Sequence, residues 1–121
     1  PAHPLLLAYA GSATSMRATT TMLPWKKMSF AEDGLAQIDK ALSLLQPSHE
    51  EQLHRGVSVA LETRFVAATT FLNLPSMFNR GSRGNKLMAE VTGSPMLALA
   101  PAGFQAAVRA QAARLAAKEQ K

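Results

Sequence analysis

The stretch that decides the fold is SFAEDGLAQIDKALSLLQ, residues 29–46, followed by Pro47 and then by SHEEQLHRGVSVALETRFVAATTFLN, residues 48–73. Ser29 and Glu32 form a capping box, in which the serine oxygen accepts a free N–H of the first turn and the glutamate reaches back. Apolar residues then recur three or four positions apart, on one helical face: Leu35, Ile38, Leu42 and Leu45. Because Pro47 cannot continue a helix, we predict a helix over residues 30–46.

The second half of this stretch repeats the pattern. Ser48 and Glu51 form another capping box, and Glu50 adds a second negative charge at the positive end of the helix that follows. The apolar positions at helical spacing are Leu53, Val57, Ala60, Leu61, Phe65, Ala68, Phe71 and Leu72. Since a short Pro-Ser turn joins them, helices over 30–46 and 49–73 are predicted to fold back as an antiparallel hairpin.

Two further helices are predicted downstream. A short helical stretch at residues 87–91 is bounded by the turn cluster TGSP, residues 92–95. Pro101 suits the first position of a long last helix, whose apolar stripe is Phe104, Val108, Ala112 and Leu115. No run of strand periodicity has a useful length, so the predicted fold class is all-α.

The segment before the first capping box has a different character. Glu32 is the first acidic residue of the chain, and residues 1–28 carry only Arg17, Lys26 and Lys27 as charges. Ordering such a segment costs about 1–2 kcal/mol per residue in backbone entropy, which its sparse apolar surface cannot offset alone. We therefore predict an extended docking arm over 1–28, lying on a partner, ahead of a small helical domain over 29–121.

The composition limits the class of protein further. Thirteen Lys and Arg against eight Asp and Glu give a net charge of +5, which favours anionic partners such as nucleic acid, phospholipid headgroups or acidic protein surfaces. The absence of cysteine excludes disulfides, thiolate metal sites and cysteine nucleophiles. The longest charge-free run, residues 91–108, is interrupted by two glycines and two prolines, so no transmembrane helix is expected.

Two histidines beside two glutamates raise the question of a metal site. His49 and His54 are five positions apart, about 140° around a helix, so a single helix would not present both to one metal ion. The Glu51–His54 spacing matches the Glu-x-x-His element of di-iron bundles, but that site needs a second such element, which the sequence lacks. We interpret the segment as a helix cap with a surface Glu50–His54 pair, and predict no metal, cofactor or catalytic site. A small hydrolase or metal enzyme would instead require a pocket around His49, Glu51 and His54.

The basic residues that lie near glycines or next to the tryptophan are the strongest candidates for a binding function. In the segment 80–86 three cations lie three positions apart, with glycines that let the backbone approach a phosphate or headgroup closely; the alternative is a solvated loop between helices. The single tryptophan with its two following lysines could anchor on a partner or a membrane interface, or could close the end of the core. The candidate partner- or anion-binding residues are Trp25, Lys26, Lys27, Arg80, Arg83, Lys86, Arg109 and Arg114.

These observations favour a non-catalytic accessory or structural subunit of a large multi-subunit assembly. The acid-poor, Ser- and Thr-rich composition of residues 1–31 resembles organelle-targeting segments. We therefore expect a mitochondrial respiratory-chain or ATP-synthase complex, with an organellar or cytoplasmic location otherwise. The docking elements would be the arm and the basic loop, and the partners other protein subunits. The alternative is an organellar ribosomal or other RNA-binding protein that contacts phosphates through the basic loop and the last helix.

Overall fold

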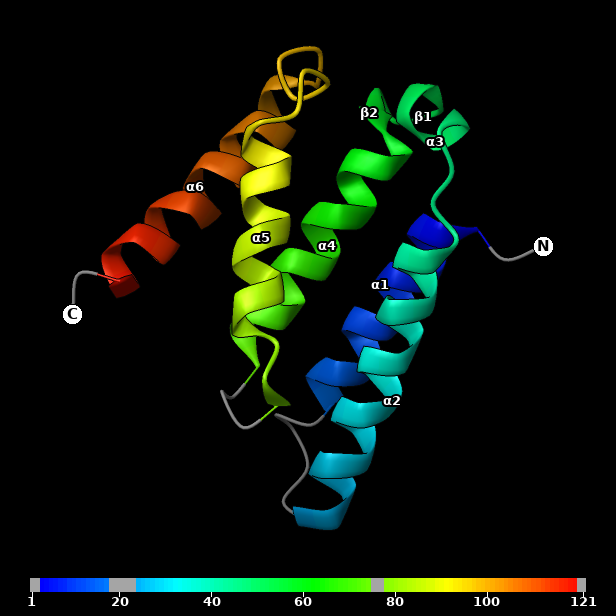
Figure 1. The fold of residues 1–121 in the computed structure, drawn as a ribbon, viewed down its shortest axis with the longest axis vertical. Helices are drawn as coiled ribbons and strands as arrows, with labels where there is room; N and C mark the ends of the chain where they lie inside the picture. The colour runs from blue at the N-terminus through cyan, green and yellow to red at the C-terminus, as the bar shows by residue number, and fades with distance from the viewer. Residues whose placement is uncertain (1–2, 18–23, 75–77, 120–121) are drawn as a thin grey trace.

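The computed structural model describes residues 3–17, 24–74 and 78–119. Figure 1 shows α4 lying between the α1–α2 pair and the α5–α6 pair. The elements are α1 (Pro4–Met16), α2 (Pro24–Ser43), α3 (Ser48–Glu51), β1 (Leu53–His54), β2 (Val57–Ser58), α4 (Val59–Asn73), α5 (Gly81–Thr92) and α6 (Ala102–Glu119). The predicted all-α class is confirmed, and the short β1–β2 hairpin is the only sheet in the described ranges.

The N-terminal segment is a helix where the structure describes it. Pro4 occupies the first turn of α1, where its fixed φ and missing N–H suit helix initiation. The predicted extended arm is therefore wrong for residues 4–16, and residues 24–28 belong to α2. The rest of the arm lies outside the described residues, apart from His3 and Arg17. The physical reason is that α1 finds its covering surface within the chain, on α2 and α4.

The close contact between α1 and α2 depends on small residues. A Cβ atom at Gly11 would lie 2.7 Å from the carbonyl oxygen of Gly34, and one at Gly34 would lie 2.5 Å from that of Gly11. Ser15, one turn after Gly11, is fully buried in the same contact. These residues let the two backbones approach closely, so the antiparallel helical hairpin of this protein is formed by α1 and α2.

The predicted hairpin of helices over 30–46 and 49–73 is wrong in two respects. Ser29 lies inside α2, which starts five residues earlier and ends at Ser43, so it is not a cap. The segment 49–73 divides into α3, the β hairpin and α4, because Arg55 and Gly56 have φ values of 54° and 82°. Two consecutive positive φ angles are those of a type I′ turn and cannot continue a right-handed helix.

The cap of α4 also differs from the expected one. Ser48 makes no side-chain cap in α3, whose cap residue is Pro47. Instead, the Ser58 hydroxyl oxygen accepts the Leu61 N–H at 3.3 Å and begins α4. A cap of this kind stabilises a helix by about 1 kcal/mol.

The C-terminal half matches the prediction more closely. The last helix is found as α6, and its predicted apolar residues Phe104, Val108, Ala112 and Leu115 all pack on the core. The short helix is longer than predicted, because α5 begins at Gly81. The basic segment expected as a loop is therefore largely the first turns of a helix. Within the described ranges no helix is both long and apolar enough to cross a membrane.

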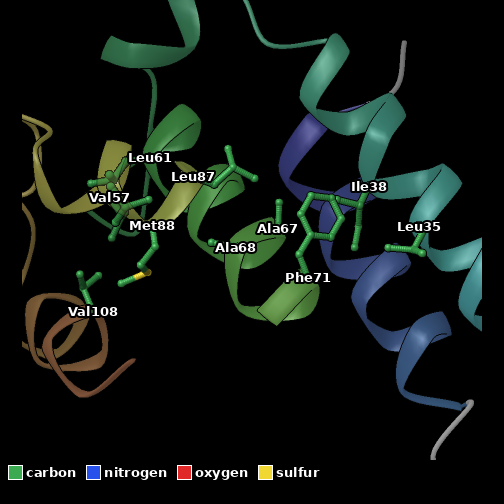
Figure 2. Packing of buried hydrophobic residues seen from close by; sticks show 11 residues of the cluster. Leu35, Ile38, Val57, Leu61, Ala67, Ala68, Phe71, Leu87, Met88 and Val108 are labelled. Carbon is green, nitrogen blue, oxygen red and sulfur yellow. The ribbon is translucent and has the colours of Figure 1, made fainter. Parts of the chain in front are cut away.

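The main core lies around α4. Phe71 projects from α4 toward Ile38 of α2, while Met88 of α5 lies with Leu61 on the opposite side (Figure 2). A smaller cluster joins α1 to α2 and α4 through Leu5, Ala8, Ala41, Val59 and Val66. Because both clusters include residues of α4, each helix pair packs against this helix.

The α1–α2 contact predicts that Gly34→Ala destabilises the protein. The added methyl group must displace the α1 backbone, and overpacking of this kind costs about 1–3 kcal/mol. Denaturant unfolding followed by circular dichroism measures the change in the free energy of unfolding. Gly103→Ala in α6 is the matched control, since nothing lies within 4 Å of its added Cβ. Equal stability of the two variants would contradict the prediction.

Candidate functional site

Two of the predicted anion-binding residues are brought together, but around a carboxylate of the chain itself. Arg80 Nη1 donates to both oxygens of Asp39 at 2.8 and 3.0 Å, and Arg83 Nη1 donates to Oδ1 at 2.9 Å. Both guanidinium groups also lie over the Phe71 ring, at 5.4 and 5.7 Å from its centroid. This cluster ties the start of α5 to α2, so much of its positive charge is neutralised internally.

The other predicted cations whose side chains the structure describes do not converge on a single site. Lys86 lies exposed on α5 near Arg83, whereas Arg109 and Arg114 are exposed on α6. Lys26 is exposed in the first turn of α2. Trp25 and Lys27 also lie in that helix by their backbone positions, and their side chains are outside the description.

The histidines and glutamates of the suspected metal segment are dispersed. His49 Nδ1 accepts the Gln46 N–H at 2.8 Å, and Glu50 pairs with Arg64 at 2.8 Å. The predicted Glu50–His54 pair is therefore wrong, because each residue has a different partner. No group of three or more metal-ligating side chains occurs among the described residues.

The structure reveals a polar cluster that the sequence did not predict. Glu62, in the first turn of α4, is a buried residue whose carboxylate receives two neighbours. The Tyr9 hydroxyl of α1 donates to Oε2, and His54 Nδ1 of β1 lies 3.3 Å from Oε1. A buried carboxylate is destabilising unless it is hydrogen-bonded or paired. The cluster therefore binds three separate elements to one another.

The β hairpin determines where His54 lies. Leu53 pairs with Ser58 and His54 with Val57 in an antiparallel register, closed by the two-residue turn Arg55-Gly56. The Val59 N–H donates to the Gln52 carbonyl at 2.8 Å and fixes the hairpin to the start of α4. This geometry places the His54 imidazole beside Glu62, which lies in the first turn of α4.

A surface cleft opens over this cluster. Its apolar lining comes from three segments: Leu6 and Tyr9 of α1, Val57 of β2, and Pro101 with Phe104 at the start of α6. Its polar lining is His54, Arg55 and Glu62. The Phe104 ring packs edge-to-face on Phe65, with centroids 5.4 Å apart. We call this surface the Glu62 cleft.

Tyr9 is electrostatically unusual within the cleft. Partial burial raises the pKa of its phenol well above the usual 10.0, and the hydrogen bond to Glu62 and the negative charge of that carboxylate raise it further, while Arg55 opposes the shift. The phenol therefore stays a neutral hydrogen-bond donor across the physiological pH range. Its donation to Glu62 is a hydrogen bond between a phenol and a partly buried carboxylate.

Weak signals in the sequence could have pointed to this cluster. Glu62 is the only acidic residue between Glu51 and Glu90, and it directly follows the apolar residues Val59, Ala60 and Leu61. Tyr9 is the single tyrosine of the chain. Neither signal identifies the other, because 53 residues separate them and only the packing of α1 on α2 and α4 brings them together.

No known family model matches this chain, and searches of curated proteins and of solved structures find no match. The site is therefore interpreted from its own geometry.

The raised pKa of Tyr9 predicts an unusual ultraviolet titration. Because the chain has one tyrosine, phenolate absorbance reports on Tyr9 alone. In the native protein the absorbance should rise at a higher pH than in the urea-denatured protein, where the phenol titrates near its usual value of 10.0. Coincident titrations of the native and denatured protein would show that the Tyr9–Glu62 contact does not form.

The Tyr9–Glu62 hydrogen bond predicts that removing the Tyr9 hydroxyl lowers stability by an amount that depends on pH. A phenol whose pKa is raised on folding contributes stability below its unfolded pKa and loses it as the pH rises toward the folded value. Tyr9→Phe should therefore lower the free energy of unfolding by about 1–2 kcal/mol at neutral pH, and this deficit should shrink above pH 10.0. Denaturant unfolding of both proteins across this range measures the difference. A deficit that stays constant with pH would contradict the prediction.

Proposed function

We propose that this protein is a non-catalytic accessory subunit of a larger multi-subunit assembly and that it docks through the surface around the Glu62 cleft. The observation that carries the proposal is the exposure of large apolar side chains at this end of the molecule. Leu6 is 67% exposed and Tyr9 46% exposed on adjacent turns of α1, and Leu53 of β1 is 60% exposed. Leu6 and Tyr9 line the cleft, and Leu53 lies on the other face of the adjoining hairpin. Exposed apolar side chains in and beside a hollow are typical of protein interaction sites.

A neighbouring segment adds to this surface. Leu99, which is 74% exposed, lies in the connection between α5 and α6. That connection and the β hairpin lie at the same end of the molecule, the top of Figure 1. The hairpin turn also approaches the connection directly, since a Cβ at Gly56 would lie 3.1 Å from Pro101 Cγ. A partner seated over the cleft would therefore also reach this connection.

The proposed docking surface differs from the one expected from the sequence. Residues 4–16 were expected to lie on a partner, whereas one side of this helix, with Leu5 and Ala8, packs on α2 and α4, and its large exposed apolar side chains are Leu6, Tyr9 and Met16. The start of α5 also carries less free charge than expected, because Asp39 pairs with both of its arginines. The mitochondrial location, in a respiratory-chain or ATP-synthase complex, rests on composition and remains a prediction.

The proposal predicts that the protein migrates with a large particle. A tagged form of the protein, made in its own cells, should migrate on a native gel far above the 12.9 kDa of the chain. Leu6→Ser combined with Leu53→Ser should reduce this incorporation severalfold, because both side chains are exposed and their loss leaves the core intact. Ala106→Ser with Ala113→Ser, on the exposed side of α6, is the matched control.

Two outcomes would contradict the proposal. Migration of the wild-type protein as a free monomer would rule out its role as an accessory subunit. Loss of the particle on nuclease treatment, with a steep fall in incorporation as salt rises, would instead favour the RNA-binding alternative.

A further inference from the structure

We infer that the Glu62 cleft binds a protein segment that carries an acidic side chain next to a large apolar one. In this arrangement Arg55 pairs with the carboxylate, and the apolar group packs between Leu6, Tyr9 and Phe104. The inference rests on the proposed function, because it names the chemistry of the partner that the docking surface recognises.

The first support is the conformation of Arg55. Its φ of 54° places it in the left-handed region, at the first position of a type I′ turn, where glycine, asparagine and aspartate are favoured and arginine is not. Local strain at an exposed position is often maintained by function. The Arg55 side chain makes no hydrogen bond or ion pair with any residue that the structure describes, although its charge opposes the rise in the pKa of Tyr9, so its guanidinium donors remain available to a partner.

The second support is the charge that the cleft presents to a partner. Glu62 is the acidic residue of the cleft, but it is buried, and its two oxygens already contact Tyr9 and His54. Arg55 lies exposed at the rim and has no such partner in the described ranges. The available charge is therefore positive, and the net charge of +5 on the chain favours an acidic partner in the same sense.

The third support is the apolar lining beside the arginine. Leu6 is largely exposed and Phe104 half-buried, and both border the same cleft as Arg55. An apolar side chain placed here removes both surfaces from water, which is the dominant favourable term in most protein associations. A carboxylate positioned beside it then gains a charge-assisted bond at the edge of a partly desolvated site. A cationic or purely polar segment would lack one of these two terms.

Synthetic peptides test the inference on the folded protein. The probes are two fluorescein-labelled peptides of equal length, one alternating Leu with Glu and the other alternating Leu with Gln, with binding measured by fluorescence anisotropy. The wild-type protein should bind the Leu-Glu peptide roughly tenfold more tightly, equivalent to one well-placed charged interaction. Equal affinity for the two peptides would overturn the inference.

Arg55→Asn is the critical variant. Asparagine tolerates a positive φ, so the variant should be at least as stable as the wild type while losing most of its preference for the Leu-Glu peptide. Arg55→Lys should retain the preference. Lys118→Gln removes one exposed cation from α6, outside the cleft, and should leave the preference unchanged. An equal loss in Arg55→Asn and Lys118→Gln would show that only overall charge matters and would overturn the inference.

Photo-crosslinking in the assembled particle separates this inference from the proposed function. A photoreactive amino acid at position 6 should cross-link to a subunit segment that contains Asp or Glu beside a large apolar residue. Cross-linking to lipid, to a second copy of this chain or to a segment without an acid would overturn the inference and leave the accessory-subunit role intact. A wild-type protein that is free of any particle would contradict the proposed function itself.

Discussion

The close approach of α1 and α2 at Gly11 and Gly34 is the contact on which the remaining structure depends. Larger residues would hold the two helices apart, because each glycine faces the backbone carbonyl of the other. With the helices at this separation, Leu5 and Ala8 reach the cluster formed with Val59 and Val66 on α4. The same placement brings the Ser12 and Thr70 hydroxyls to 2.8 Å and the Tyr9 hydroxyl to Glu62. The close contact between α1 and α2 therefore positions Tyr9 for the polar cluster that it forms with Glu62 and His54.

The sequence predicted those elements whose apolar spacing is regular and undisturbed. The start of the last helix was predicted to within one residue, because Pro101 precedes a stripe with 3.6-residue periodicity. The single helix predicted over 49–73 is not found, since the apolar residues 53 and 57 also suit a short hairpin. The hairpin itself was not predicted, because the turn at Arg55 lacks the usual Asn-Gly signal. In α1 the low charge was interpreted as weak folding propensity, whereas alanine, glycine and serine there provide a close-packed helix contact.

The site was less accessible to sequence reasoning than the fold. Arg80 and Arg83 have the spacing of an anion site, but an aspartate 41 residues earlier lies against them. Glu62 was not among the predicted site residues, because its partners come from residue 9 and from a hairpin that was not predicted. Pairings of this kind depend on tertiary placement, and a single sequence contains no direct record of them. The positions of the basic residues are evident from the sequence, but which of them pair with an acidic residue of the chain is not.

The residues of the Glu62 cleft come from positions 6 to 104 of the chain, so the cleft exists only after α1, the hairpin and α6 have all reached their final positions. A ligand that recognises such a composite surface binds the folded state and not the unfolded chain, and it shifts the folding equilibrium toward the native form. Recognition through this surface would therefore act as quality control. In the proposed assembly, an incompletely folded copy would not be bound and would be left exposed to proteolysis.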